Sequence, residues 1–195
     1  MRKEKEIEIK DNLKKLETIN LTEIEEQSSF LKIKKYKCTI GEREIYREKL
    51  IKGKSDGSAV TIIPLLANGE LLMVMEPRVF TKKTVGIGFP AGYIEESEDE
   101  NEAALRELKE ETGYVADEII KLDEFYQDEG CSGALNKIFV ARNCKKKYAQ
   151  KLDEDEIVEY ITLTFEEIKE LLNNKYIMGG HTKLAIEKYK EFITK

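Results

Sequence analysis

Three glutamates at the spacing i, i+3 and i+4 are the residues of this chain best suited to chemistry. Glu107, Glu110 and Glu111 occur in ALRELKEETG, a run of good helix formers, and this spacing brings their side chains to one helix face. Like charges this close repel one another, so a cation is expected beside them. Arg106 can reach Glu110, but one arginine does not neutralise three carboxylates. A divalent cation such as Mg²⁺ goes further, because it takes oxygen ligands and bridges to substrate phosphates.

This acidic cluster has a functional and a structural interpretation. A bound divalent ion would neutralise a diphosphate and activate a water for attack at phosphorus. The alternative is a solvated acidic face, since exposed charged helix faces are common. In either case Leu105 and Leu108 are expected to point away from the glutamates toward a core, with Ala104 at the boundary.

A helix over 97–112 is expected to carry the cluster. Ser97 and Glu100 have the spacing of a capping box, and Gly113 stands where a helix C-cap glycine belongs. Pro90 and Gly92 precede the helix and mark a loop, because these residues punctuate regular structure.

Strand patterns flank this helix on both sides. Alternating or β-branched apolar runs predict strands over 31–40, 44–51, 59–66, 71–75, 114–126, 137–141 and 157–163. A loop or short strand is expected over 86–92, and a polar loop over 145–155. Thr164 and Glu167 form a second capping box that predicts a helix over 165–173, and a last helix is expected over 182–193. Residues 1–26 indicate a surface helix or a partly ordered arm. This order predicts an α+β fold, a mixed sheet with helices packed on it.

Composition limits the class of protein. The 195 residues suggest one domain with a short extra segment, and an apolar content of 41% is enough for a core. With 39 acidic and 33 basic residues the net charge is −6, which argues against general binding to nucleic-acid phosphates. A local basic pocket for a small phosphate compound stays open. No apolar run approaches the length of a membrane-spanning helix, and the N-terminus lacks the apolar region of a signal peptide.

The cysteines and the single histidine carry little chemical signal. Cys38, Cys131 and Cys144 are odd in number and widely spaced, which predicts ordinary thiols in a reducing cytosol and a cytoplasmic protein. His181 is the only histidine, so a Ser-His-Asp or Cys-His mechanism would depend on it alone. Its place in GGHTKL, just before a helical pattern, favours a capping or loop role.

The segment around the acidic cluster resembles the Nudix box. That motif has a glycine, five residues, a glutamate, seven residues, Arg-Glu, an apolar residue, any residue, Glu-Glu, any residue, glycine and an apolar residue. The matching positions here are Gly92, Glu98, Arg106, Glu107, Leu108, Glu110, Glu111, Gly113 and Tyr114. Every charged and glycine position agrees, and only Tyr114 departs from the aliphatic preference at the end.

The resemblance implies a Nudix fold, in which a mixed sheet lies between helices (α/β/α) and the box forms a loop-helix-loop, here with additional antiparallel strands at the N-terminus. It implies that Glu107 and Glu111 bind a divalent metal, with Mg²⁺ expected and Mn²⁺ as an alternative. Glu110 would be a further ligand or a catalytic helper. Arg106 would orient the glutamates, and Glu98 would support the loop or reach a metal-bound water.

Beyond the box, the layout resembles the ADP-ribose pyrophosphatase group. Phe89-Pro90-Ala91-Gly92 is similar to its lead-in to the box, which implies that the Ala91 carbonyl is a metal ligand. Arg47 and Arg78 become candidates for binding the diphosphate or nucleoside, with a surface salt bridge as the alternative for each. Gly130-Cys131-Ser132 resembles a downstream loop and makes Ser132 a substrate-binding candidate. Glu129 and Ala134 depart from the group's usual residues there, so a different diphosphate sugar stays open.

The late acidic loop resembles the one that supplies the general base in this group. Glu154, Asp155 and Glu156 are the candidates, and a solvated turn is the alternative for each. The N-terminal segment resembles the group's dimerisation region, where the first strands exchange between two copies. We therefore expect an N-terminal helix and strand segment over 1–55, a Nudix domain over 56–195 and a homodimer, with a monomer as the alternative.

The function that the resemblance implies is Mg²⁺-dependent hydrolysis of a nucleoside diphosphate sugar, with ADP-ribose giving AMP and ribose 5-phosphate. The alternatives are a hydrolase of nucleoside triphosphates and a non-catalytic ligand sensor that kept the fold. The N-terminal strands and late acidic loop argue against the first alternative, and the intact set of three glutamates argues against the second.

Overall fold

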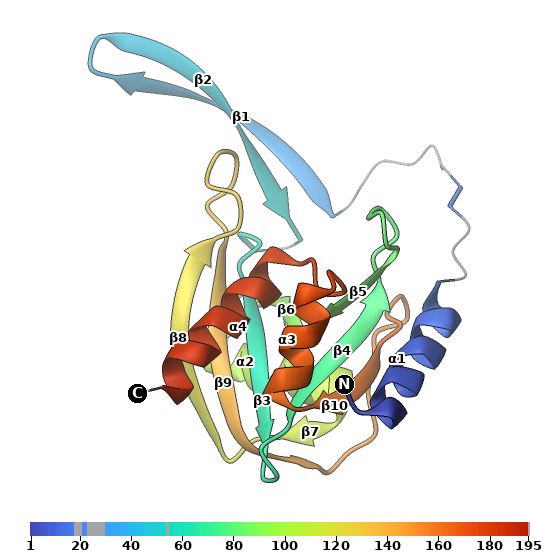
Figure 1. Cartoon of the computed structure of the whole chain (residues 1–195). Coiled ribbons are helices and arrows are strands. Elements are labelled where there is room, and N and C mark those ends of the chain that lie inside the picture. The colour runs from blue at the N-terminus through green and yellow to red at the C-terminus, as the bar shows by residue number, and fades with distance from the viewer. Residues whose placement is uncertain (18–20, 23–29, 54, 195) are drawn as a thin grey trace.

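The computed structural model of this chain describes residues 1–17, 21–22, 30–53 and 55–194 (Figure 1). Its helices are α1 (Lys3–Leu16), α2 (Glu100–Thr112), α3 (Phe165–Asn173) and α4 (Gly180–Ile193). Its strands are β1 (Leu31–Ile40), β2 (Arg43–Lys52), β3 (Ala59–Leu66), β4 (Leu71–Pro77), β5 (Val85–Gly88), β6 (Ala91–Tyr93), β7 (Tyr114–Val115), β8 (Glu118–Tyr126), β9 (Leu135–Lys146) and β10 (Glu159–Leu163).

A mixed sheet forms the centre of the molecule. Within the described residues it has eight strands, in the order β10-β4-β3-β9-β7, with β5 paired to β4, β6 to β3 and β8 to β9. β3 runs parallel to β9, and the other pairs are antiparallel. The middle strands read as continuous apolar runs because both of their faces are covered, as in Ala59–Leu66, where six consecutive residues are buried.

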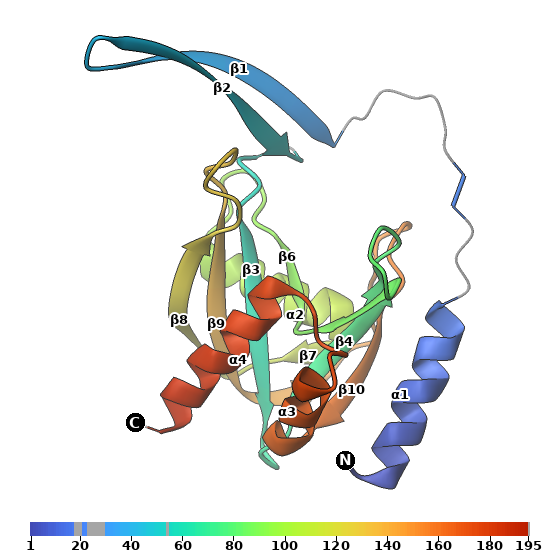
Figure 2. The ribbon, with the colours of Figure 1, turned by 45° about the horizontal axis from the view of Figure 1, so that its top comes forward.

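Helices cover both faces of this sheet (Figures 1 and 2). α3 and α4 lie on one face, where Ile168, Ala185 and Ile186 join a cluster with Ile63 and Met73. α2 lies on the other face, where Ala104 and Leu108 pack with Val60, Ile62 and Phe139. α1 packs beside β4 and β10, with Ile9 and Leu16 buried. The expected α+β fold with helices on both sides of a mixed sheet is therefore confirmed.

β1 and β2 form an antiparallel hairpin that projects away from this body (Figure 2). β1 is exposed along most of its length and β2 over its first half, including the apolar side chains of Ile33, Tyr36, Ile40 and Tyr46. At the base of the hairpin, the backbone N–H of Leu50 donates to the Cys131 carbonyl at 2.8 Å. The expected N-terminal antiparallel strands are present, with the turn at Gly41.

The expected start of the box helix is wrong. Ser97 does not cap it: its φ is +66°, and α2 begins at Glu100 with Asp99 as the N-cap. The Asp99 carboxylate accepts from the backbone N–H of Asn101 at 2.8 Å, because a short acidic side chain at this position can reach the unpaired donors of the first turn. Gly113 closes the helix as expected, with a φ of +71°.

Other boundaries shift by a few residues. β9 extends over 135–146 rather than 137–141, the strand expected over 114–126 is interrupted at 116–117, and α4 starts at Gly180 rather than at residue 182. The capping box of Thr164 and Glu167 is present at the start of α3. The surface helix expected in the N-terminal segment is α1, while 18–20 and 23–26 lie outside the described residues.

Candidate active site

The C-terminal end of α2 is held by the last residue of β9 and by the loop that follows it. The ammonium of Lys146 donates to the Thr112 carbonyl at 2.6 Å, and the side-chain amide of Gln150 donates to the Glu111 carbonyl at 2.6 Å. The N–H of Lys151 donates to the Glu110 carbonyl at 2.9 Å. These donors satisfy carbonyls that a helix end leaves without partners. The late loop and the acidic helix are thereby fixed against each other.

Two of the three glutamates are buried at the floor of a cleft. Glu107 is 9% exposed and Glu111 4% exposed. Gly92 lies directly against Glu107: a Cβ added there would fall under 3.0 Å from the Glu107 carboxylate. The N–H of Ala91 donates to Glu111 Oε2 at 3.3 Å. The strand β6 therefore meets α2 at the two carboxylates, and the glycine of the motif is required for this approach.

This burial corrects the expected orientation of the helix. Ala103, Ala104 and Leu108 are fully buried, whereas Leu105 is 39% exposed. The side of α2 that packs on the sheet thus adjoins Glu107 and Glu111, which do not lie opposite the apolar stripe. A solvated acidic face, the structural interpretation, does not describe these two residues.

Arg106 links the glutamates of the motif into one network. Its Nε donates to Glu98 Oε1 at 2.7 Å, and its Nη1 donates to Glu107 Oε1 at 2.8 Å and Glu110 Oε2 at 3.1 Å. Its Nη2 donates to the Tyr93 carbonyl at 3.0 Å and Glu98 Oε2 at 3.0 Å. Glu98 also accepts from the N–H of Glu95 at 2.9 Å. The geometry suits positioning, because a planar guanidinium fixes the direction of each carboxylate.

The buried carboxylates carry an electrostatic cost. Burial raises the pKa of Glu107 to about 7 against the attraction of Arg106. Burial, followed by repulsion from Glu76, Glu107 and Glu156, raises the pKa of Glu111 well above its usual range. By contrast, the hydrogen bonds from Arg106 lower the pKa of Glu98. The positive charge of Arg106 is thus directed at Glu98, Glu107 and Glu110, while Glu111 faces further carboxylates.

A divalent cation suits this arrangement. Glu107, Glu111 and the backbone of Ala91 line the same cleft, and an ion there would offset the repulsion that raises both pKa values. In the described part of the chain, no group of three or more His, Cys, Asp or Glu side chains is close enough to hold a metal by itself. Mg²⁺ commonly takes one or two carboxylates from a protein and completes its shell with water and substrate phosphates.

The cleft has a volume of about 730 Å³, within the range of small-molecule sites. Its floor is Ala91, Gly92, Glu107 and Glu111, and its rim includes Glu76, Arg78 and Glu156. Arg78 forms an ion pair with Glu76, whose pKa is raised by burial. His181, at the start of α4, also lines the cleft, and burial lowers the pKa of its imidazole.

The structure brings together some of the residues expected in the site. Glu98, Arg106, Glu107, Glu110 and Glu111 form the α2 cluster. Ala91, Arg78 and Glu156 line the cleft with it.

Four other candidates lie elsewhere. Glu154, Asp155 and Glu156 are all exposed, but of the three only Glu156 lines the cleft. Arg47 lies in the projecting hairpin, where its Nη1 donates to the Tyr46 carbonyl at 2.9 Å. Ser132 is 7% exposed, and its hydroxyl accepts from the Ala134 N–H at 3.1 Å, so it closes a turn.

Several residues that line the cleft were not predicted from the sequence. Those not expected are Lys52, Ala59, Glu76, Tyr93, Glu95, Phe125, Gln127, Asn136, Asp153, Gly180 and His181. Gln127 directly follows β8, and Asn136 lies in β9. Only the strand pairing brings Asn136 beside β3, where the Thr61 hydroxyl donates to Asn136 Oδ1 at 2.9 Å. The motif could have pointed to Glu95 and Tyr93 because they lie inside it.

A sheet between helices with an Arg-Glu network on a loop-helix-loop defines the class of protein, and comparison with known families agrees. Residues 56–180 match the NUDIX domain. The chain belongs to the Nudix hydrolase family.

The relatives extend this assignment. The chain is 32% identical over 130 residues to ADP-ribose pyrophosphatase of Bacillus subtilis. The aligned segment covers 66% of this chain and 70% of that protein. It is 35% identical over 130 residues to a methanol dehydrogenase activator of Bacillus methanolicus, with the same coverage. It is 30% identical over 161 residues to GDP-mannose pyrophosphatase of Escherichia coli K12, covering 77% of this chain and 82% of the other.

The fold has a similar solved structure. A crystal structure of an ADP compounds hydrolase superposes with a TM-score of 0.74 at 21% identity, covering 88% of this chain and 91% of that one. Among the described residues, there is no helix long and apolar enough to cross a membrane.

Proposed function

We propose that this chain is a Mg²⁺-dependent hydrolase of the diphosphate linkage in nucleoside diphosphate sugars, with ADP-ribose as substrate and AMP and ribose 5-phosphate as products. The observation that carries the proposal is the pair of buried carboxylates, Glu107 and Glu111, at the floor of an open cleft against Gly92. The names of two relatives, ADP-ribose pyrophosphatase and GDP-mannose pyrophosphatase, support this substrate class.

In this proposal, the carboxylates of Glu107 and Glu111 and the carbonyl of Ala91 hold the cation. When bound, Mg²⁺ or Mn²⁺ supplies neutralisation of the diphosphate charge and a more acidic water. Arg106 keeps the glutamates in place through its five hydrogen bonds to Glu98, Glu107, Glu110 and the Tyr93 carbonyl. Glu110, half shielded at the edge of the network, serves as a further ligand or as a helper of the water.

Glu156 is the proposed general base. It lies on the rim of the cleft, and its position is fixed by the loop, where its carboxylate accepts from the Asp153 N–H at 3.2 Å. It would accept the proton of the attacking water as the oxygen adds to one phosphorus. The bond from that phosphorus to the bridging oxygen breaks, and the second phosphate leaves with the bridging oxygen.

Arg78 is the proposed contact to the diphosphate. It lines the cleft and is exposed, so its guanidinium can exchange Glu76 for a phosphate. A guanidinium can take two phosphate oxygens at once, which favours a diphosphate over a single charged group. Lys52, at the end of β2, adds a second cation to the rim.

We also propose that residues 1–55 act in dimerisation while residues 56–195 form the catalytic domain. A hairpin with exposed Ile33, Tyr36, Ile40 and Tyr46 is only marginally stable in water by itself. A second copy that covers it would bury these side chains, and Arg47 would reach a cleft only in that assembly. Size-exclusion chromatography with light scattering tests this: a monomer at micromolar concentration contradicts it.

A product screen tests the proposed reaction. ADP-ribose, GDP-mannose, other nucleotide sugars and nucleoside triphosphates are incubated with Mg²⁺ or Mn²⁺, and phosphate products are resolved by chromatography. The expected result is AMP and ribose 5-phosphate as the fastest products. Preference for triphosphates would reassign the substrate, and binding with no product from any compound would indicate a sensor.

The free thiols of the three cysteines, all within the described residues, support a reducing, cytoplasmic location.

A further inference from the structure

Asn136 is a buried polar residue in the wall of the cleft, and the proposed reaction does not use it. It is 6% exposed and lies near the start of β9, where the following Ile138 and Phe139 are apolar and fully buried. Burying an amide side chain is unfavourable unless its polar atoms find hydrogen-bond partners. A partner is therefore expected for the oxygen and for the nitrogen of Asn136.

Thr61 is the partner of the oxygen. It is fully buried in β3, and its hydroxyl donates to Asn136 Oδ1 at 2.9 Å. This bond turns Oδ1 toward β3 and leaves the amide nitrogen as the atom without a partner among the described residues. In that part of the chain, Thr182 Oγ1 is the one side-chain atom that lacks a partner and is also closed off from solvent, so the nitrogen of Asn136 can be reached from the cleft.

The neighbouring amide, Gln127, is already engaged. Its Nε2 donates to the Gly57 carbonyl at 2.9 Å and to the Leu135 carbonyl at 3.4 Å, and its Oε1 accepts from the Lys52 ammonium at 3.2 Å. Gln127 thus holds the chain segments at this end of the sheet together. Asn136 is the amide of the cleft whose donor remains for a ligand.

The strand pairing sets the distance between Asn136 and the floor of the cleft. Ala59 of β3 pairs with Asn136 on one side and with Tyr93 of β6 on the other. Because neighbouring strands lie about 4.8 Å apart, Asn136 is roughly 10 Å from β6, the strand that brings Ala91 and Gly92 against α2. With a diphosphate at the floor, a group bonded to the diphosphate would reach Asn136.

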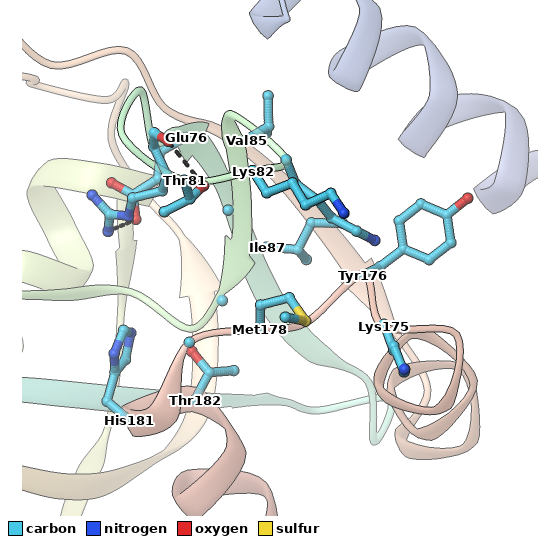
Figure 3. Close-up of a pocket in the computed structure, with 15 residues that line it drawn as sticks. Glu76, Thr81, Lys82, Val85, Ile87, Lys175, Tyr176, Met178, His181 and Thr182 are labelled. Carbon is cyan, nitrogen blue, oxygen red and sulfur yellow. Dashed lines mark hydrogen bonds and ion pairs between the residues drawn. The ribbon is translucent and has the colours of Figure 1, made fainter.

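His181 adds a second uncharged polar group. It lies at the start of α4, a helix that contacts β3 and β9, and burial lowers the pKa of its imidazole. Its ring lies well apart from Tyr176 and Met178 of the adjoining cavity (Figure 3), and it makes no hydrogen bond to the described residues. A neutral imidazole both donates and accepts. Together with an amide donor it suits hydroxyl groups better than phosphates.

The base of a nucleotide has a different place in the cleft. Tyr93 is 41% exposed on β6 and offers an aromatic surface on which a base can stack. Phe125, which pairs with Asn136 from β8, packs against the core instead. The surroundings of Asn136 therefore favour a sugar over a base.

We propose that Asn136 recognises the terminal sugar of the substrate, which is the sugar on the far side of the diphosphate from the nucleoside. Its amide nitrogen donates to a hydroxyl oxygen of this sugar. Thr61 is a positioning residue, because its bond to Oδ1 aims the nitrogen at the cleft. The inference rests on the proposed function and assigns sugar specificity in the same site to a residue outside the Nudix box.

The test compares two ligands in millimolar Mg²⁺ by equilibrium titration. One is an analogue of ADP-ribose whose bridging oxygen is replaced by a methylene group, and the other is the same analogue with a methyl group in place of the terminal ribose. The double variant Thr61→Val, Asn136→Leu makes both partners of the buried bond apolar with similar shape, so it should melt close to the wild type. It should weaken binding of the ribose compound by about 10-fold and that of the methyl compound by less than about 2-fold.

Two further variants separate recognition from structure. Thr61→Val alone keeps the amide of Asn136 and should weaken the ribose compound less than the double variant does. Asn173→Leu makes the same change of side chain on the exposed surface of α3, outside the cleft, and should bind both compounds as the wild type does.

The proposal is overturned if the double variant binds the ribose compound with wild-type affinity. It is also overturned if both compounds weaken equally, which would indicate a nucleoside contact or a structural role for Asn136. Neither result affects the proposed function as long as the wild type hydrolyses ADP-ribose. If the wild type binds neither compound and hydrolyses no nucleotide sugar, the proposed function fails and this inference fails with it.

Discussion

Gly92 and Glu107 lie so close that no side chain can be accommodated at residue 92: a Cβ there would fall under 3.0 Å from the Glu107 carboxylate. This contact joins β6 to α2 and fixes where the buried carboxylate points. The glycine that begins the motif is thus required by the position of a charge fifteen residues later in the sequence, and not by its own backbone angle.

Gly92→Ala should therefore inactivate the enzyme. The methyl group must displace Glu107, and a metal ligand moved by about 1 Å costs on the order of 100-fold in rate. Hydrolysis of ADP-ribose in saturating Mg²⁺ measures the effect. Gly133→Ala is the matched control, because a Cβ at Gly133 meets nothing within 4 Å. Equal rates for Gly92→Ala and the wild type would show that Glu107 need not hold this position.

The late acidic loop offers a comparison of three neighbouring carboxylates. Glu156 lines the cleft, so Glu156→Gln should lower kcat by about 100-fold through loss of the proposed general base. Glu154→Gln and Asp155→Asn are controls of matched charge, and both should stay within about 3-fold of the wild type, since neither residue lines the cleft. A larger loss in either control than in Glu156→Gln would move the base to that residue.

The metal-free protein should lose stability as the pH rises. Burial raises the pKa of Glu107 from 4.5 to about 7 in the folded state. The stabilisation from the protonated carboxyl is therefore complete below pH 4.5 and is lost as the pH rises through 7, on the order of 3 kcal/mol. Urea unfolding in EDTA between pH 5 and 8 should show this fall for the wild type and a smaller one for Glu107→Gln. Parallel curves would contradict a Glu107 carboxyl whose pKa is raised by burial.

The contact between Arg2 and Glu167 should instead stabilise the fold at neutral pH and lose this effect as the pH falls. Arg2 donates to Glu167 from Nε at 2.9 Å and from Nη2 at 2.7 Å, and these bonds lower the pKa of Glu167 to about 2. The stabilisation is present above pH 4.5 and is lost as the pH falls through 2.

Arg2→Ala should accordingly lower the melting temperature at pH 7, and its difference from the wild type should shrink toward pH 2. Arg142→Ala, which breaks an exposed ion pair with Glu118, should have a smaller effect at every pH. If the two variants behave alike, the Arg2 contact does not anchor α1 to α3.

The sequence predicted the fold and the motif helix because both depend on local patterns: the apolar period of the strands, Gly113 at the helix end, and the fixed spacing of the box. It did not predict that Glu107 and Glu111 are buried. A helical projection places charged residues in solvent and leucines in the core, yet Leu105 is exposed and Ala103 is buried. Burial here is decided by Gly92 on β6, a contact between separate elements.

Long-range pairing also explains the cleft residues that were missed. Glu76 follows an apolar strand and carries no motif of its own, but it faces Glu111 and Glu156 once β4 is in the sheet. Arg47 and Ser132, expected from resemblance alone, lie in a projecting hairpin and a closed turn. Of the adjacent residues Glu154, Asp155 and Glu156, only Glu156 lines the cleft, and this depends on the conformation of the loop, which the sequence pattern does not give.

The most direct test is the effect of Mg²⁺ on the melting temperature of the wild type and Glu111→Gln. If the buried carboxylates hold a divalent ion, Glu111→Gln should melt higher than the wild type in EDTA, because one of two repelling buried charges is gone. Millimolar Mg²⁺ should then raise the melting temperature of the wild type and leave that of the variant unchanged. An equal Mg²⁺-induced rise in both proteins would contradict the assignment of the metal to Glu107 and Glu111.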